Sequence, residues 1–128
     1  MVGGSAGAVK ARLQMGVSPG WRNDEEGGRT ALHVAAIAGD ARILELLLQF
    51  STSSVVNARD AREWTPLMEA AHKGHIDCTK LLLQRGADIN ARDRLGLTAT
   101  HIACIAGRYN LAFNLPFLSV ARSLLARS

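Results

Sequence analysis

Four histidines are the side chains of this sequence that are best suited to metal binding or proton transfer. They are His33, His72, His75 and His101. A zinc site of the H-E-x-x-H type needs two histidines four residues apart on one helix face. The sequence contains no such pair and no H-E-x-x-H motif. We therefore expect the histidines to have structural roles and expect no bound metal.

The cysteines and carboxylates also lack a pattern that indicates catalysis. Cys78 and Cys104 are 26 positions apart and form no C-x-x-C motif, which argues against a zinc ribbon or a disulfide scaffold. Glu25 and Glu26 fall in an expected loop and Glu69 on an expected helix, so no two carboxylates are placed to share a proton. No glycine-rich phosphate loop or G-x-S-x-G motif is present. We expect a non-enzymatic chain without a cofactor.

The composition favours one helical domain over residues 1–128. Hydrophobic residues make up 48% of the chain, yet aromatic residues only 5%, while alanine and leucine contribute 20 and 17 residues. Such a mixture suits closely packed helices. No apolar run reaches the roughly 18 residues that span a bilayer, so we expect no membrane span. The first 20 residues also lack the apolar stretch of a secretory signal.

An internal repeat organises the chain. The tetrapeptides TALH, TPLM and TATH begin at Thr30, Thr65 and Thr98. Each is followed by two small residues and then by a glycine, which is Gly39, Gly74 or Gly107. Leucine triplets follow at 46–48 and 81–83, and the segments VNARD and INARD follow at 56–60 and 89–93. Because several columns keep one register, the sequence predicts repeated structural units.

Each repeat predicts a pair of helices. Threonine is a good N-cap, and Pro66 would occupy the first helical position, where a missing N–H costs little. Leu32, Ala35 and Ala36 would form one apolar helix face, and the following glycine would end the helix in a left-handed conformation. A second helix would bury Ile43, Leu46 and Leu47. One such pair cannot bury both faces, so the units must stack.

The pattern resembles the ankyrin repeat. The residues that carry the resemblance are 63–71, 74–75, 81–83 and 86–91. It implies an all-α solenoid of stacked antiparallel helix pairs joined by β-turn or hairpin loops. The expected units are an N-terminal half-repeat at 8–23, repeat 1 at 24–60, repeat 2 at 61–93, a degenerate repeat 3 at 94–113, and a C-terminal capping helix or frayed tail at 114–128. Repeat 1 has two extra residues within 51–56.

The two ends depart from the pattern. Residues 9–16 resemble the second helix of a preceding repeat, which we favour over a transit peptide suggested by the basic residues Lys10, Arg12 and Arg22. After Gly107, the leucine triplet is replaced by a segment that contains Pro116, and proline inside a helix costs about 3 kcal/mol. The apolar residues between 117 and 125 follow helical spacing, so a capping helix or a frayed end is expected there.

The resemblance assigns structural roles to several polar residues. In ankyrin repeats, the histidine of the Thr-x-Leu-His motif bridges the backbones of adjacent units, which applies to His33 and His101. His75 follows the reversal glycine, where histidine is common. Cys78 and Cys104 occupy core columns and are expected to be buried.

The resemblance also implies a concave binding face formed by the loop tips and the first helices. The candidate contacts are Arg59, Asp60, Arg62, Trp64, Glu69, His72, Lys73, Arg92, Arg94 and Leu97, with Ile37 and Ile105 as further candidates. Trp64 is expected to face the solvent and to be a binding hot spot. The alternative is that Trp64 packs across the loop onto Leu97. The first interpretation predicts that Trp64→Ala weakens binding and leaves the melting temperature nearly unchanged.

Asn90 is a candidate modification site. The resemblance implies that asparaginyl hydroxylases could act on it, because such enzymes favour an aliphatic residue at −1, an acid at −2 and a leucine at −8, and Asn90 has Ile89, Asp88 and Leu82 there. Asn57 matches only at −1, with Val56. The alternative for Asn90 is a turn-stabilising role alone.

The net charge of +4 first suggests a basic binding protein. However, all 11 acidic residues lie between 24 and 93, so the expected basic excess lies at the two ends. We expect a monomeric protein–protein interaction scaffold of the cytoplasm or nucleus. The alternatives are a basic-ended module that contacts nucleic acid or an anionic membrane, and a substrate-recruiting part of a larger complex such as a ubiquitin ligase. No stripe of alternating basic and aromatic residues supports nucleic-acid binding.

Overall fold

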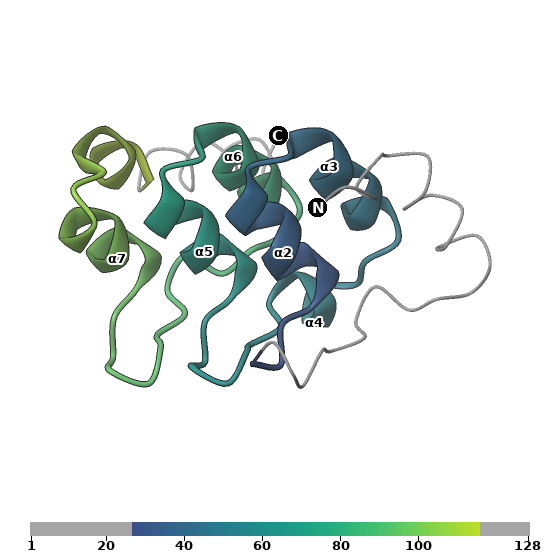
Figure 1. Cartoon of the computed structure of the whole chain (residues 1–128), viewed down its shortest axis with the longest axis horizontal. Helices are drawn as coiled ribbons and strands as arrows, with labels where there is room; N and C mark the ends of the chain where they lie inside the picture. The colour runs from purple at the N-terminus through teal and green to yellow at the C-terminus, as the bar shows by residue number, and fades with distance from the viewer. Residues whose placement is uncertain (1–26, 116–128) are drawn as a thin grey trace, which may run out of the picture.

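The computed structural model describes residues 27–115, which form helix pairs stacked side by side (Figure 1). The first helices of the pairs form one row, and the second helices form a row behind it. The first row contains α2 (Ala31–Ala38), α5 (Pro66–Lys73) and α7 (Ala99–Ile105). The second row contains α3 (Ala41–Gln49), α6 (Ile76–Gln84) and a helix over 109–115. A short helix, α4 (Ser53–Val56), follows α3. The all-α repeat architecture expected from the sequence is confirmed.

Each first helix begins at the predicted threonine. Thr30, Thr65 and Thr98 each accept a hydrogen bond from the backbone N–H three residues later. Nδ1 of His33 in turn accepts from the N–H of Thr30, which completes a capping box. Pro66 occupies the first turn of α5. The threonine columns therefore fix where the first row of helices starts.

The reversal between the helices of a pair depends on glycine. Gly39 and Gly74 end α2 and α5 with φ of 73° and 76°, a left-handed conformation that side chains with a Cβ rarely adopt. A Cβ at Gly39 would also lie 2.6 Å from the ring of His75 in the next repeat. Space as well as backbone conformation therefore requires glycine at position 39.

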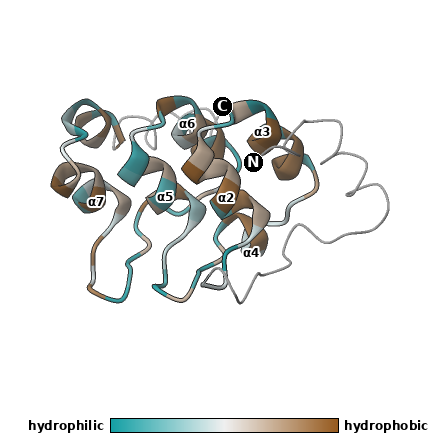
Figure 2. Ribbon diagram, in the orientation of Figure 1, coloured by the Kyte–Doolittle hydropathy of each residue, from teal (hydrophilic) through white to brown (hydrophobic). Residues whose placement is uncertain are grey.

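The core lies between the two rows of helices. In the first row, small residues such as Ala36 and Ala71 are fully buried, so neighbouring helices approach closely. Figure 2 shows apolar segments on the helices and polar ones in the loops below them. The expected buried face of α3 needs a correction, because Leu46 is only partly buried. The buried residues of α3 are Ile43, Leu44, Leu47 and Leu48, and α3 packs against α2 and α6.

The two extra residues of repeat 1 are accommodated by α4, which begins after the N-cap Thr52. Asn57 follows α4 and ties it to the next repeat. Its amide Nδ2 donates to the carbonyl of Gly86 at 3.1 Å, and its Oδ1 accepts from the N–H of Asp88 at 2.7 Å. The insertion therefore adds a turn of helix without breaking the contact between repeats.

Repeat 3 has a second helix over 109–115 in which Leu111, Ala112 and Leu115 are buried. The expected boundary at 113 between repeat 3 and the tail falls inside this helix, because Leu115 still packs into the core. The expected half-repeat at 8–23 lies outside the described residues. So does the capping helix or frayed tail beyond 115.

Candidate partner-binding surface

The loops before α5 and α7 and the exposed sides of the first helices form one continuous surface, which we call the hairpin face. It comprises loops 59–64 and 92–97 and the outer sides of α2, α5 and α7; both loops project below the helices in Figure 1. The backbone N–H of Asp60 donates to the carbonyl of Trp64, and that of Asp93 donates to the carbonyl of Leu97. Both loops are therefore closed by hairpin-type hydrogen bonds.

A buried aspartate organises each loop. Oδ1 of Asp60 accepts from the N–H groups of Arg62 and Trp64 at 2.8 and 3.0 Å. Oδ1 of Asp93 accepts from the N–H groups of Leu95 and Leu97, both at 2.9 Å. Burial by itself disfavours the charged form of Asp60, but these backbone donors and the guanidinium of Arg62 outweigh it and lower its pKa.

Asp60 therefore does not present its carboxylate to a partner, and its place among the expected contacts is corrected. Its residue surface is only 6% exposed, because both oxygens face the loop and Arg62. The same holds for Glu69, which is 2% exposed on α5. Glu69 is paired with Arg62 and lies 3.8 Å from Nε of Arg29. Burial raises the pKa of Glu69, and the two arginines only partly offset that effect.

Trp64 is also not the solvent-facing side chain that the sequence predicts. It is partly buried and packs against the core. Its indole Nε1 donates to Oδ2 of Asp93 at 2.9 Å, so the ring spans the gap to the next hairpin. The guanidinium carbon of Arg62 lies 4.1 Å from the ring centroid, and His72 approaches at 5.4 Å in an edge-on geometry. The alternative expectation, that Trp64 packs across to the next loop, is closer to the structure, although the hydrogen bond there is to Asp93 and not a contact with Leu97.

The arginines of the two loops tie the hairpins together. Arg59 Nη1 donates to the carbonyl of Arg92, and Arg94 Nη2 donates to the carbonyl of Ala61 at 2.8 Å. Arg92 Nη1 donates to the carbonyl of Gly96 at 2.9 Å. These guanidinium groups remain on the surface, because Arg59, Arg92 and Arg94 are all exposed. The expected contacts at the loop tips are therefore available and held in place.

The first helices contribute fewer exposed groups than expected. Lys73 is exposed and His72 is partly buried at the end of α5. Ile105 of α7 is 73% exposed, whereas Ile37 of α2 is only partly exposed. Leu97 is partly buried and packs against the core.

Sequence reasoning missed Leu95, which is 82% exposed at the tip of loop 92–97. Aligning Asp60 with Asp93 places Leu95 in the column of Arg62. An apolar residue where the preceding repeat has a charged one is a signal that could have identified it. Arg108 was also missed; its Nε donates to the carbonyl of His72 at 3.4 Å and extends the charged surface.

Three of the four histidines, His33, His75 and His101, hold repeats together or cap helices. His33 is fully buried, and its Nε2 lies 2.6 Å from the carbonyl oxygen of Trp64, which confirms the expected bridge. His101 caps α7 through Thr98 in the same way but is exposed, because no further repeat packs on it within residues 27–115. Nε2 of His75 lies 3.1 Å from the carbonyl oxygen of Ile37. Among the described residues, no cluster of His, Cys, Asp or Glu could hold a metal ion.

The two cysteines differ in their surroundings. Cys78 is fully buried, and burial raises its pKa to about 11. Cys104 was expected to be buried but is exposed, because it lies on the last described first-row helix, where its column is not covered. The sequence predicted that both cysteines are buried, and this is right for Cys78 and wrong for Cys104.

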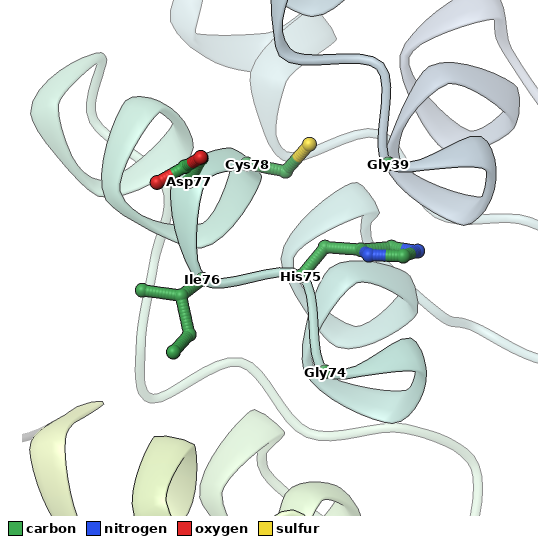
Figure 3. A pocket seen from close by; sticks show the side chains of 6 residues that line it. All are labelled: Gly39, Gly74, His75, Ile76, Asp77 and Cys78. Atoms are coloured by element: carbon green, nitrogen blue, oxygen red, sulfur yellow. The ribbon is translucent and has the colours of Figure 1, made fainter.

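A shallow hollow of about 410 Å³ lies where the glycine turns of repeats 1 and 2 meet. In Figure 3, the ring of His75 extends between Gly39 and Gly74, while the side chains of Ile76 and Asp77 lie on the side away from this ring. The hollow is open to solvent, and one of its lining residues is His75, whose ring joins repeat 2 to repeat 1. We therefore interpret the hollow as the boundary between two packed repeats and not as a ligand site.

The two asparagines of the rear loops also differ. Both polar atoms of the Asn57 amide are bonded to the next repeat, as described above. Asn90 is exposed, and its backbone N–H donates to Oδ1 of Asp88 at 2.9 Å. Asn90 therefore sits in a turn with an accessible side chain, and its hydroxylation stays a prediction. Over residues 27–115, no helix is long and apolar enough to cross a membrane.

Comparison with known proteins shows which protein family has repeats of this kind. A family model of ankyrin repeats in three copies matches residues 2–93 and 56–116. The chain is 35% identical over 100 residues to the E3 ubiquitin-protein ligase KEG of Arabidopsis thaliana, which covers 78% of this chain and 6% of that protein. It is 34% identical over 98 residues to the human SH3 and multiple ankyrin repeat domains protein 2, covering 77% of this chain and 5% of that protein.

The mouse protein phosphatase 1 regulatory subunit 12A is 39% identical over 82 residues, which cover 64% of this chain and 8% of that protein. The chain thus spans less than a tenth of the length of each of these relatives. The chain belongs to the ankyrin-repeat family.

Proposed function

We propose that the chain is a non-catalytic scaffold or adaptor that binds another protein on a concave hairpin face. Ankyrin repeats are generally protein-interaction modules. The observation that carries the proposal is the way loops 59–64 and 92–97 are tied to each other while their tips stay exposed. Two arginines and the Trp64 indole bridge the loops. Such preorganisation lowers the entropy that is lost when a partner binds.

A photo-crosslinking experiment tests this proposal. A benzophenone amino acid replaces Leu95 on the hairpin face, and a matched variant carries it at Lys80, which is exposed on the second-row helix α6. We expect proteins of the host lysate to crosslink at position 95 and not at position 80. Equal crosslinking at both positions, or crosslinking at position 80 alone, contradicts the proposal. Leu95 is a better probe than Trp64, whose removal also weakens the fold.

A second candidate is the recruitment of substrates to a larger regulatory complex. The similarity to repeat regions of a ubiquitin ligase and of a phosphatase regulatory subunit favours it. In this function the chain still acts only by binding, and the activity belongs to other polypeptides. Co-purification of ligase or phosphatase activity with the crosslinked partner, lost when the position-95 crosslink is absent, is the expected result.

We further propose a monomer of the cytoplasm or nucleus. The two cysteines are free, and such thiols suit a reducing compartment. Sedimentation velocity and fluorescence imaging of the tagged full-length protein would check the two parts separately.

A further inference from the structure

The charged residues of the described chain are divided unevenly between its two sides. The hairpin side, taken as the first-row helices with the loops or turns that precede them, carries six basic residues: Arg29, Arg59, Arg62, Lys73, Arg92 and Arg94. Its acidic residues are Asp60, Glu63, Glu69 and Asp93. The second-row side, taken as the second helices with the turns that flank them, carries four basic residues, Arg42, Lys80, Arg85 and Arg108, and four acidic ones, Asp40, Glu45, Asp77 and Asp88. The net charges are therefore +2 on the hairpin side and 0 on the other.

Burial increases this contrast on the hairpin side. Asp60, Glu69 and Asp93 are each less than a tenth exposed and are bonded to loop N–H groups or to arginines. Only Glu63 has an exposed carboxylate, with 53% of its side chain accessible, and it lies 3.8 Å from Arg59. A partner approaching the hairpin face therefore meets mostly guanidinium and ammonium groups. The sequence suggested that the repeats are mildly acidic and that the basic excess lies at the two ends, yet the hairpin side of the described repeats presents mainly basic groups.

The arginines of loop 92–97 keep their charge available. Arg92 and Arg94 are held by the neutral carbonyl oxygens of Gly96 and Ala61. Within residues 27–115, no carboxylate lies within 4.0 Å of either guanidinium. A guanidinium has five N–H donors, so one hydrogen bond to a backbone carbonyl leaves other donors for a bidentate contact with a carboxylate. Both groups are thus oriented by the fold without being neutralised.

The surroundings of His72 support a positive field at this face. Burial lowers the pKa of His72, and Lys73, Arg62 and Arg108 lower it further. These three residues come from α5, from loop 59–64 and from the segment after α7. No neighbouring acid is among the causes. Cations of repeats 2 and 3 therefore act together on His72 in the last turn of α5.

An apolar side chain stands within this basic surface. Leu95, 82% exposed, directly follows Arg94 at the loop tip. We propose that the hairpin face binds an acidic segment of a partner protein, whose carboxylates contact Arg92 and Arg94 and whose apolar side chain covers Leu95. This inference rests on the proposed function, because it specifies the kind of protein that the scaffold takes.

The same surface is less suited to nucleic acid. Binding of single strands uses aromatic rings with open faces on which bases stack. Trp64 is the aromatic residue of this region, and its ring is covered by Arg62 and approached by the edge-on His72. A protruding leucine between charged groups instead suits the mixed polar and apolar contacts of a protein segment.

Fluorescence anisotropy with a defined probe tests the inference. The probe is a fluorescein-labelled peptide of about twelve residues, made of Glu and Asp around one central Leu, titrated with the full chain at low ionic strength. We expect Arg92→Gln combined with Arg94→Gln to weaken binding about tenfold. The control, Arg42→Gln combined with Lys80→Gln, removes the same charge from the second-row side and should change Kd less than about twofold.

The loop arginines also bond backbone carbonyls, so circular dichroism must show that the double variant is folded. Leu95→Asp provides a second variant that does not depend on those bonds. It adds a negative charge at an exposed tip, and we expect it to weaken peptide binding while the melting temperature stays unchanged.

Three results of the binding titrations would overturn the inference. They are no binding of the acidic peptide to the wild-type chain, equal weakening by the control pair, and tighter binding of an oligothymidylate or of phosphatidylserine vesicles than of the peptide. A partner that crosslinks at position 95 but contacts it without an acidic segment would also refute this inference, while the proposed function would stand. If no protein crosslinks at position 95, the proposed function itself fails.

Discussion

Replacing Trp64 with alanine should destabilise the protein, although the sequence suggested a nearly neutral change. The side chain packs against the core, bonds Asp93 through its indole N–H, and lies beneath the guanidinium of Arg62. Removing a fully buried tryptophan costs about 3–5 kcal/mol. Because Trp64 is only partly buried, we expect Trp64→Ala to lower the free energy of unfolding by about 2 kcal/mol.

The assay is urea denaturation followed by far-UV circular dichroism, which does not depend on tryptophan emission. A loss of this size should lower the melting temperature by about 8 °C for a domain of this length. Asp93 keeps its bonds from the N–H groups of Leu95 and Leu97, so the next loop should remain closed in the variant. The loss should therefore come mainly from packing between the two repeats.

Two matched variants separate the contributions. Trp64→Phe retains an aromatic ring under Arg62 and loses the hydrogen bond to Asp93, so it should cost about 1 kcal/mol. Leu95→Ala removes a side chain that is 82% exposed and should change stability by less than about 0.5 kcal/mol. If Trp64→Ala were as stable as Leu95→Ala, with an unchanged denaturant slope, the packing of the indole between the repeats would be refuted.

Four further predictions follow from the structure. Gly39→Ala should destabilise the protein more than Gly107→Ala. Both glycines have a left-handed backbone, with φ of 73° and 80°, but only at Gly39 would the new Cβ collide with the His75 ring; equal melting temperatures of the two variants would contradict this. Cys104 should react with iodoacetamide at neutral pH while Cys78, buried and with a pKa of about 11, should not, as peptide mass spectrometry would show. Burial opposes ionisation of Asp93, but the N–H of Leu97, the Trp64 indole and further backbone donors lower its pKa on balance. A group with a lowered pKa in the folded state stabilises above its unfolded value and loses that contribution as pH falls, so urea midpoints should decline below about pH 4, and less steeply in Asp93→Asn. Asn90, and not Asn57, should gain one oxygen atom when the protein is incubated with an asparaginyl hydroxylase, because the Asn57 amide is bonded to the next repeat; an unmodified Asn90 peptide would refute this.

The repeat columns alone determined the positions of the helices. Thr30, Thr65 and Thr98 act through hydrogen bonds to the third residue that follows them, and Gly39 and Gly74 act through their own backbone angles. Such local interactions depend on neighbours in the chain, so spacing predicts them. The bridge from His33 to the next repeat could be expected as well, because the family keeps a histidine in that column.

The accessibility of individual side chains was decided only by the tertiary structure. The sequence suggests that Asp60 and Glu69 are surface charges, yet both are buried beside Arg62 and Arg29. Arg62 precedes α5, and Arg29 belongs to the preceding repeat. Cys104 reads as a core residue, yet it is exposed on the last first-row helix within residues 27–115. In a solenoid, each repeat is buried by its neighbours, so exposure depends on what lies in the adjacent unit.

The distribution of charge over the surface also could not be predicted from the sequence alone. From sequence, the net charge of +4 seemed to arise at the two ends of the chain, around a mildly acidic set of repeats. The fold buries three of the four carboxylates on the hairpin side and leaves Arg59, Arg62, Arg92 and Arg94 exposed. Composition counts every charge equally, whereas the surface potential depends on which charges are paired and buried. The sequence by itself therefore determined the repeat and its helices, and only the packing of one repeat on the next decided which face of the protein is basic.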